Sequence, residues 1–347
     1  MPAWARWDFS LDIIAPAALV VAIYWRGLER RPGAFDAHPL RHLLFLGGVS
    51  ITFLSLASPL DALADRLFSV HQVQHILLRV VGPMLIALAK PHATLLAGLP
   101  GWLRRRVSAP IAGSRAVGAV FGALAKPAVS TLLFVASLYV WQWPAFHNRA
   151  ILDDGVHEAM HVTMLAAGLL FFWRLFDQRR PPKGLGFGAR LMMLWVAVLA
   201  NIPIGAYTCF KSRELYWAYD AARLSLGVSA MDDERLGGFI MWAPASMMML
   251  IAVLIVVHAW GGHEEREERR RAAALSAGAP AAVASMPGPV ELGRKNRAFA
   301  YGLAAFSVSV LAATLTVAFL VLHHLAPAAP ALALDTARVG VATSLKP

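Results

Sequence analysis

Residues 71–90 read HQVQHILLRVVGPMLIALAK, a run that opens with two histidines four positions apart and continues with mostly apolar side chains. About 20 helical residues are needed to cross the hydrocarbon core of a membrane, so this run is long enough to span it. The arrangement returns at 157–161, which read HEAMH and open a second apolar run that extends to 176. We therefore predict two membrane-spanning helices that each carry a pair of imidazoles at one end.

The composition of the whole chain is typical of a membrane protein. Of its 347 residues, 58% are hydrophobic and only 15% are charged, and the mean hydropathy is +0.56. The formal charge of +11 comes largely from arginines in short clusters between apolar runs, as in loops beside an anionic lipid leaflet. We therefore expect contact with membrane lipid and no binding of nucleic acid. The single cysteine, Cys209, excludes an intrachain disulfide and any CxxC motif.

The distribution of apolar runs predicts the fold class. We expect an all-α, polytopic transmembrane helix bundle with seven core spans and an eighth C-terminal span, near residues 10–26, 41–57, 71–90, 127–143, 157–176, 190–209, 236–261 and 298–324. The connection 91–126 is less apolar, and it is either an interfacial amphipathic segment or a plain cytoplasmic loop.

The positions of Lys and Arg predict the orientation of these spans. One set of connections holds more than twice as many basic residues as the other, which places that set in the cytoplasm and the N-terminus outside. The predicted organisation is a seven-span core, a charged and then Ala/Pro/Gly-rich flexible cytoplasmic linker, an eighth transmembrane helix and a flexible external tail, at 1–262, 263–295, 296–325 and 326–347.

In this topology both histidine pairs lie at the outer face. Side chains four apart on a helix project from the same face, so His71 with His75, and His157 with His161, can each reach one ion. Gly82 and Gly168 fall on the same stripes as the histidines and allow neighbouring helices to approach closely. Imidazole binds copper, zinc, iron and nickel, whereas sulfur ligands favour Cu(I). His147 and the sulfur donors Met164, Cys209 and Met241 are further candidate ligands at that depth.

Four motifs in this order resemble a known family. HQVQH at 71–75, WQWPAFH at 141–147, HEAMH followed by GLLFFW within 157–173, and DERLGGFIMW at 233–242 are similar to the polytopic CtaG family of cytochrome c oxidase assembly factors. The resemblance extends over about residues 10–262, and it does not include the single-span, cysteine-bearing copper chaperone that shares the CtaG name. The positions that carry it are His71, Gln74, His75, Trp143, His147, His157, His161, Asp233, Met241 and Trp242.

The resemblance implies a non-catalytic factor of the bacterial inner (plasma) membrane that helps to assemble a haem-copper oxidase. The implied cargo is copper, as Cu(I) or Cu(II), held at the periplasmic face by the histidine pairs with help from residues such as Asp233. The implied partners are cytochrome c oxidase subunits and periplasmic copper chaperones. A homo-oligomer is also compatible with the small residues in several spans.

Two departures and three alternatives accompany this interpretation. The chain has Asp233-Glu234 where the family pattern has Asp-Gln, which adds a charge near the predicted site, and the eighth span exceeds the usual seven. Arg79, one turn below His75, needs a partner such as Glu158, or else supports the histidines. The alternatives to copper delivery are a metal transporter, a haem-binding membrane cytochrome and a metal-free assembly scaffold.

Overall fold

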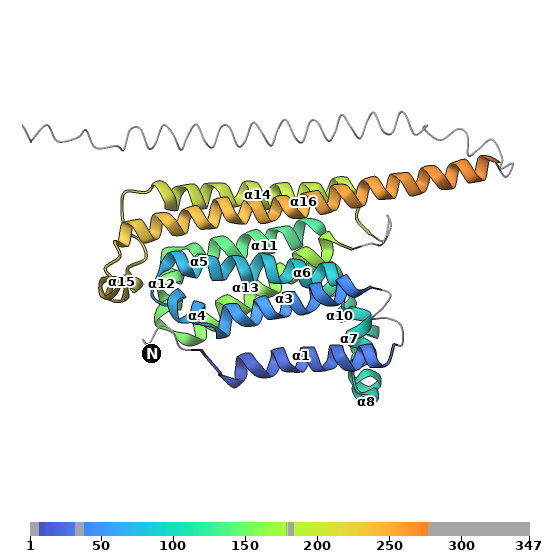
Figure 1. Ribbon diagram of the computed structural model, residues 1–347, viewed down its shortest axis with the longest axis horizontal. Coiled ribbons are helices and arrows are strands. Elements are labelled where there is room, and N and C mark those ends of the chain that lie inside the picture. Colours follow the sequence, from blue (N-terminus) through green and yellow to red (C-terminus); the bar gives the residue numbers. More distant parts are fainter. Residues whose placement is uncertain (1–6, 32–37, 178, 180–183, 277–347) are drawn as a thin grey trace, which may run out of the picture. The chain divides into compact units, whose positions relative to one another are not determined.

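The structure is a computed structural model that describes residues 7–31, 38–177, 179 and 184–276. These residues form helices and connecting turns, with no strand among them, which confirms the predicted all-α class (Figure 1). Among these described residues, six helical stretches are long and apolar enough to cross a membrane, and two bent pairs would raise the number to eight. The span predicted at 298–324 and the tail 326–347 lie outside the described residues.

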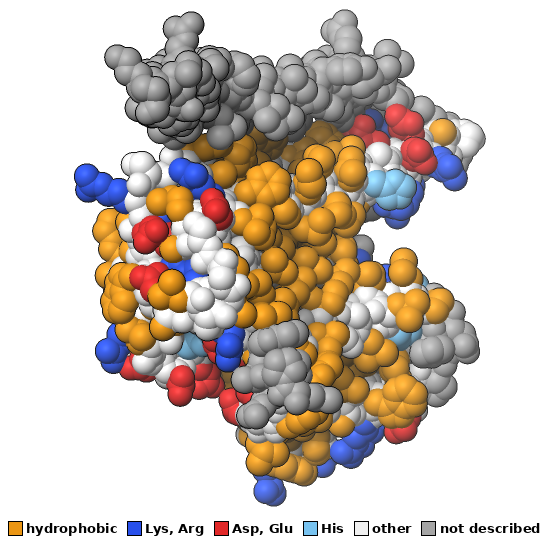
Figure 2. All heavy atoms as spheres, turned by 60° about the vertical axis from the view of Figure 1, so that its left-hand side comes forward, with side chains coloured by type: hydrophobic (Ala, Val, Ile, Leu, Met, Phe, Trp, Pro, Cys, Tyr) orange, Lys and Arg blue, Asp and Glu red, His pale blue; other side chains and the backbone are white. Residues whose placement is uncertain are grey.

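The long helices agree with most of the predicted spans. They are α1 (Leu11–Glu29), α3 (Pro39–Ala57), α13 (Asp154–Leu175), α14 (Phe187–Phe210), α16 (Ala230–Ser276) and the continuous stretch of α5 (Phe68–Ile76), η2 (Leu77–Val81) and α6 (Gly82–Ala89). On the face shown in Figure 2, hydrophobic side chains cover much of the surface between the ends of the bundle, and charged side chains gather toward those ends. This distribution is expected when lipid replaces water around the middle of a protein.

The α5–η2–α6 stretch is the most buried of the candidate spans. Glycine permits its close packing, because a Cβ added to Gly168 of α13 would lie 2.2 Å from the carbonyl oxygen of Arg79. A Cβ on Gly82 would lie 2.4 Å from Thr52 Oγ1 of α3. The predicted role of both glycines in close helix approach agrees with this geometry, although each one faces a different neighbour.

A bend of 72° separates α11 (Pro127–Gln142) from α12 (Pro144–Leu152). Pro144 causes it locally, since proline disfavours the helical conformation at the residue before it, and Trp143 is extended there with φ −65° and ψ 123°. His147, expected in an external loop, therefore lies on a short helix that folds over the end of the bundle.

Two connections contain more helix than a plain loop would. Residues 91–126 are mostly helical, which disagrees with the second of the two alternatives expected for this connection, and they form α7 (His92–Gly98), α8 (Gly101–Leu103), η3 (Arg104–Ser108), α9 (Ala109–Gly113) and α10 (Arg115–Leu124). Helix α16 continues to Ser276, beyond the predicted start of the linker at 263. The charged run favours helix because Glu and Arg have high helix propensity and pair at short spacing, as Glu267 and Arg270 do at 3.3 Å.

The remaining short elements lie at the end of the bundle where α5 and α13 begin. They are α4 (Pro59–Ala64), η4 (Trp217–Tyr219) and α15 (Asp220–Leu226). Figure 1 shows α4, α12 and α15 at this end and α7, α8 and α10 at the opposite one. The histidine-bearing helix ends are therefore covered by short helices and loops.

Candidate metal centre

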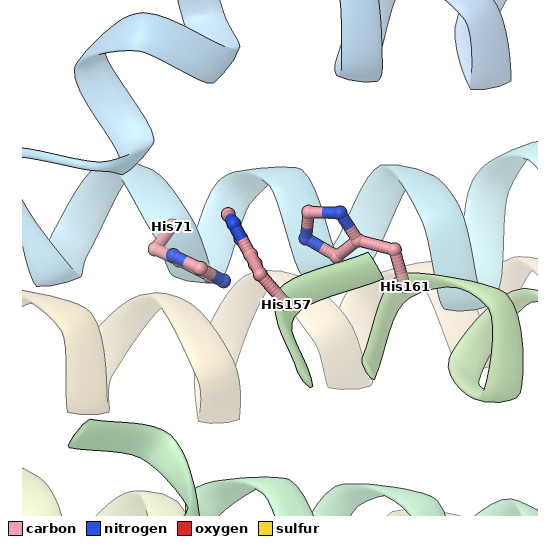
Figure 3. A group of neighbouring side chains, drawn as sticks. All are labelled: His71, His157 and His161. Atoms are coloured by element: carbon pink, nitrogen blue, oxygen red, sulfur yellow. The ribbon is translucent and has the colours of Figure 1, made fainter. Parts of the chain in front are cut away.

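Three histidines from two helices meet at the covered end of the bundle. His71 comes from α5, and His157 and His161 come from α13, with their rings facing one another (Figure 3). One ring nitrogen from each lies within 4.8 Å of the other two. Nitrogens bound to a common ion at about 2.0–2.1 Å stand at most about 4 Å apart, so small rotations of these side chains would complete the site.

His75 lies directly beside this histidine trio. Its ring centroid is 4.4 Å from that of His71 and 5.9 Å from that of His161. The four imidazoles of the two HxxxH pairs thus form one group, with three of them close enough to share an ion in the observed rotamers. His75 also borders a cavity of about 10 Å³, large enough for about one water molecule, which is lined in part by Gln72, Arg79 and Met241.

Several ring nitrogens in this group are buried without a hydrogen-bond partner in the described part of the chain. They are Nε2 of His71, His157 and His161 and both ring nitrogens of His75. A buried polar group left unpaired costs about 1–3 kcal/mol, so five such atoms in one place call for an explanation. A bound cation would satisfy them, because neutral imidazole nitrogens are common ligands of first-row transition metals.

His147 is also completely buried, but its ring nitrogens are already engaged. Nδ1 lies 2.9 Å from the carbonyl oxygen of Trp141, and Nε2 lies 2.8 Å from the hydroxyl of Tyr219. The same hydroxyl lies 3.0 Å from Nδ1 of His71. Tyr219 is a site residue that sequence reasoning missed, because it is 148 positions from His71 and belongs to none of the four motifs.

Burial also determines whether the Tyr219 hydroxyl is protonated. Tyr219 is fully buried, and burial, followed by the nearby Asp65 and Asp233 carboxylates, raises the pKa of its phenol well above the ordinary value of 10. The phenol therefore keeps its proton at any physiological pH and can donate a hydrogen bond.

Asp233 has a different role from the predicted one of ligand. Helix α5 starts after Leu67, which has no side-chain acceptor to cap it. Asp233 supplies the cap from α16, and its two carboxylate oxygens accept hydrogen bonds from the backbone N–H groups of Phe68 and Ser69 at 2.8 and 2.9 Å. The carboxylate thereby positions the first turn of the helix that carries His71.

The extra charge of Glu234 is neutralised within the same region. Its buried carboxylate pairs with Lys211 and, at 3.3 Å, with Arg223. It also accepts the backbone N–H groups of Leu215 and Tyr216, each at 3.0 Å. Glu234 thus braces the loop 211–219 that presents Tyr219, and its charge is compensated by two cations.

The predicted sulfur donors divide into two groups. Met164 and Met241 are buried and pack in a common cluster with Met160, Leu138 and Ala150. Met241 also lines the small cavity beside His75. Cys209 is half-buried at the α14–α16 contact, where a Cβ on Gly238 would lie 2.5 Å from the Cys209 backbone nitrogen. The structure does not bring Cys209 or Asp233 into the group of ligand atoms.

Arg79 is held by groups other than Glu158, which is exposed. Its Nη2 and Nε donate to the carbonyl oxygen of Phe134 at 2.7 and 3.3 Å, and the guanidinium lies 3.8 Å from the centroid of the Phe134 ring. Nε also donates to Ser137 Oγ at 3.3 Å. These contacts attach the π-helical turn below the histidines to α11.

Two carboxylates of the segment 61–65 lie near this end of the bundle, and only Asp65 is close to a histidine of the trio. Asp65 Oδ1 lies 3.7 Å from Nδ1 of His157, and the Asp65 side chain is 52% exposed. Asp61 Oδ1 accepts a hydrogen bond from Gln74 Nε2. Partial burial, together with the Asp65 carboxylate, raises the pKa of Asp61 to about 7. Asp65 is therefore the carboxylate that lies nearest to the partly exposed His157.

The chain is similar in sequence to uncharacterized mycobacterial proteins. It is 25% identical over 259 residues to an uncharacterized protein of Mycobacterium leprae, a match that covers 70% of this chain and 37% of that protein. An uncharacterized Mycobacterium bovis protein is 25% identical over 251 residues, covering 68% of this chain and 36% of its own length. The chain thus spans little more than a third of these relatives. No solved structure matches.

A family model described as cytochrome c oxidase caa3 assembly factor (Caa3_CtaG) matches residues 20–262. The matched region contains both HxxxH pairs, the bent α11–α12 segment and the Asp233 cap, so the resemblance found in the sequence motifs is confirmed. Because the match covers well over half of its length, the chain belongs to the CtaG family of cytochrome c oxidase caa3 assembly factors.

Proposed function

We propose that this assembly factor binds copper as cargo at the histidine trio, with His75 assisting, and delivers it to a cytochrome c oxidase subunit. The observation that carries the proposal is the group of three imidazole nitrogens within 4.8 Å of one another. Their Nε2 atoms lack hydrogen-bond partners among the described residues, which leaves them available to an ion.

The surroundings favour copper over other metals that bind imidazole. Zinc sites frequently include carboxylate or thiolate ligands, whereas the ligand group here consists of imidazoles, and Met241, a residue with a thioether, is among those that line the adjacent cavity. Haem would need far more space than the cavity of about 10 Å³ beside His75. A compact ion with soft and borderline ligands fits this site best.

The site is proposed to face the periplasm, where copper arrives and where a copper-bearing oxidase domain can receive it. The excess of Lys and Arg in the opposite connections supports this orientation. Release to a client would proceed by exchange of one imidazole at a time, starting with His157, which is the most exposed of the three.

Metal analysis of protein purified with copper tests the proposal. We expect about one copper ion per chain or more, and loss of most of it in the double variant His71→Ala/His161→Ala, because each change removes a ligand. The matched control is His258→Ala, which removes an exposed histidine on α16. Unchanged copper in the double variant, or a haem absorption band in the unmodified protein, would refute the assignment.

A further inference from the structure

A continuous chain of hydrogen bonds connects the histidine trio to α11. It runs from the Trp141 carbonyl oxygen to His147 Nδ1 at 2.9 Å, from His147 Nε2 to the Tyr219 hydroxyl at 2.8 Å, and from that hydroxyl to His71 Nδ1 at 3.0 Å. His147, His71 and Tyr219 are each 0% exposed, so water does not compete for these bonds.

The Trp141 carbonyl oxygen at one end of this chain determines which atom donates in each of the three hydrogen bonds. A carbonyl oxygen only accepts, so Nδ1 of His147 carries a proton and donates it to Trp141. Neutral His147 then has a lone pair on Nε2, which accepts the hydroxyl hydrogen of Tyr219. With its hydrogen used, the Tyr219 oxygen can only accept at its second contact, so His71 donates from Nδ1.

The opposite direction would require a charged His147. Only an imidazolium could donate to both Trp141 and Tyr219, and it would place a cation in a fully buried site. The ring contacts described for His147 are to Phe68, His71, His75, Tyr216 and Tyr219, none of which carries a carboxylate that could pair with an imidazolium. Burial therefore selects the neutral ring and the direction given above.

We propose that Tyr219 and His147 are positioning residues that hold His71 in the tautomer protonated at Nδ1, so that its Nε2 lone pair serves as the metal ligand. This inference rests on the proposed copper binding, and it assigns His147 a supporting role in place of the predicted role of ligand. The unpartnered Nε2 of His71 is the atom that this tautomer leaves free. Ligating histidines generally donate their second ring N–H to such a partner.

The loop that carries Tyr219 is built to keep the hydroxyl in place. Tyr216 and Tyr219 pack against Phe68, the first residue of α5, so the loop and the histidine-bearing helix share one cluster. The Glu234 carboxylate fixes the preceding residues through two backbone N–H groups. Tyr219 is thereby held relative to α5 even though it belongs to a connection.

The test compares two buried tyrosines of the same loop. Tyr219→Phe removes the hydroxyl of the chain of bonds, whereas Tyr216→Phe removes one that donates to the Gln142 carbonyl oxygen at 2.9 Å. Copper affinity, measured by competition with a chelator, should fall by about 10–100-fold in Tyr219→Phe and change by no more than about twofold in Tyr216→Phe. An equal loss in both variants would overturn the proposal, because it would indicate a general effect on folding.

The alternative role of His147 predicts the opposite result. If His147 were a ligand through Nε2, Tyr219→Phe would release that atom and leave copper affinity unchanged or higher, which would also overturn the proposal. Nitrogen-15 NMR of the metal-free protein provides an independent readout, with the proton of His71 expected on Nδ1. If the unmodified protein binds no copper, the proposed function fails, and this tautomer measurement still decides whether the chain of bonds acts as described.

Discussion

At the scale of single residues, Gln74 belongs to the HQVQH motif but faces away from the metal centre. Its Nε2 donates to the Ser55 carbonyl oxygen at 2.8 Å and to Asp61 Oδ1 at 2.5 Å. Gln74→Leu would leave both acceptors without this donor and should lower stability by about 1–3 kcal/mol. Copper stoichiometry should be retained, as checked by metal analysis and unfolding in detergent. Loss of copper with unchanged stability would contradict the structural role that we assign to Gln74.

The partner of Gln74 predicts a pH dependence of stability. The pKa of Asp61 is raised from its ordinary value near 4 to about 7 in the folded protein. Between these values the folded state holds a proton that the unfolded state has lost, so the stability contributed by this carboxyl falls as pH rises from about 4 to about 7. Above about pH 7 both states have lost the proton, and the contribution stays constant.

Asp61→Asn removes this titration while keeping an oxygen that can accept from Gln74. The melting temperature of the wild-type protein should fall between pH 5 and pH 8 by more than that of the variant. The measurement is thermal unfolding in detergent at a series of pH values. Parallel curves for the two proteins would show that Asp61 titrates normally.

At the scale of helices, the contact between Gly168 and the Arg79 carbonyl determines how closely α13 approaches η2. Gly168→Ala would place a Cβ 2.2 Å from that oxygen, so α13 must move away together with His157 and His161. We expect a loss of about 1–3 kcal/mol of stability and weaker copper binding. The matched control is Gly47→Ala in α3, where a Cβ meets nothing within 4 Å. Equal stability and equal copper binding in the two variants would contradict the close contact of Gly168 with η2.

Local sequence explains much of the arrangement of these helices. The HxxxH spacing predicts paired imidazoles on one face, and the histidines of α5 and α13 do lie together. The Trp143-Pro144 step is the local signal for the bend before α12, because proline disfavours a helical conformation at the preceding residue. The Asp233 cap and the Tyr219 contact could not be predicted, because they join residues 165 and 148 positions apart and depend on tertiary packing.

At the scale of the whole molecule, hydropathy predicts the class of fold well. In lipid every span must be apolar outside and must satisfy its backbone hydrogen bonds internally, which long apolar helices do. Hydropathy predicts the number of spans less sharply, since bent pairs such as α11–α12 mix a crossing helix with a covering one. The sequence shows that Glu234 adds a charge near the predicted site. It does not show that Lys211 and Arg223 pair with this carboxylate, because the pairing depends on tertiary packing.

The orientation of the bundle is a prediction that labelling can test. In a Cys209→Ala background, Asp154→Cys at the histidine end should react with a membrane-impermeant maleimide added to intact cells. Arg105→Cys, exposed at the opposite end, should react only after permeabilisation, because basic connections remain in the cytoplasm. The reverse pattern would place the histidines inside the cell and exclude a periplasmic source of cargo.

The brace formed by Glu234, Lys211 and Arg223 is closed to solvent, since all three side chains are at most 3% exposed. Within the histidine trio, His157 is the partly exposed member, with a side chain that is 17% exposed and lies beside the 52% exposed Asp65. If copper enters and leaves past His157, a supplier and a recipient must bind there one after the other, and an excess of empty recipient should slow reloading.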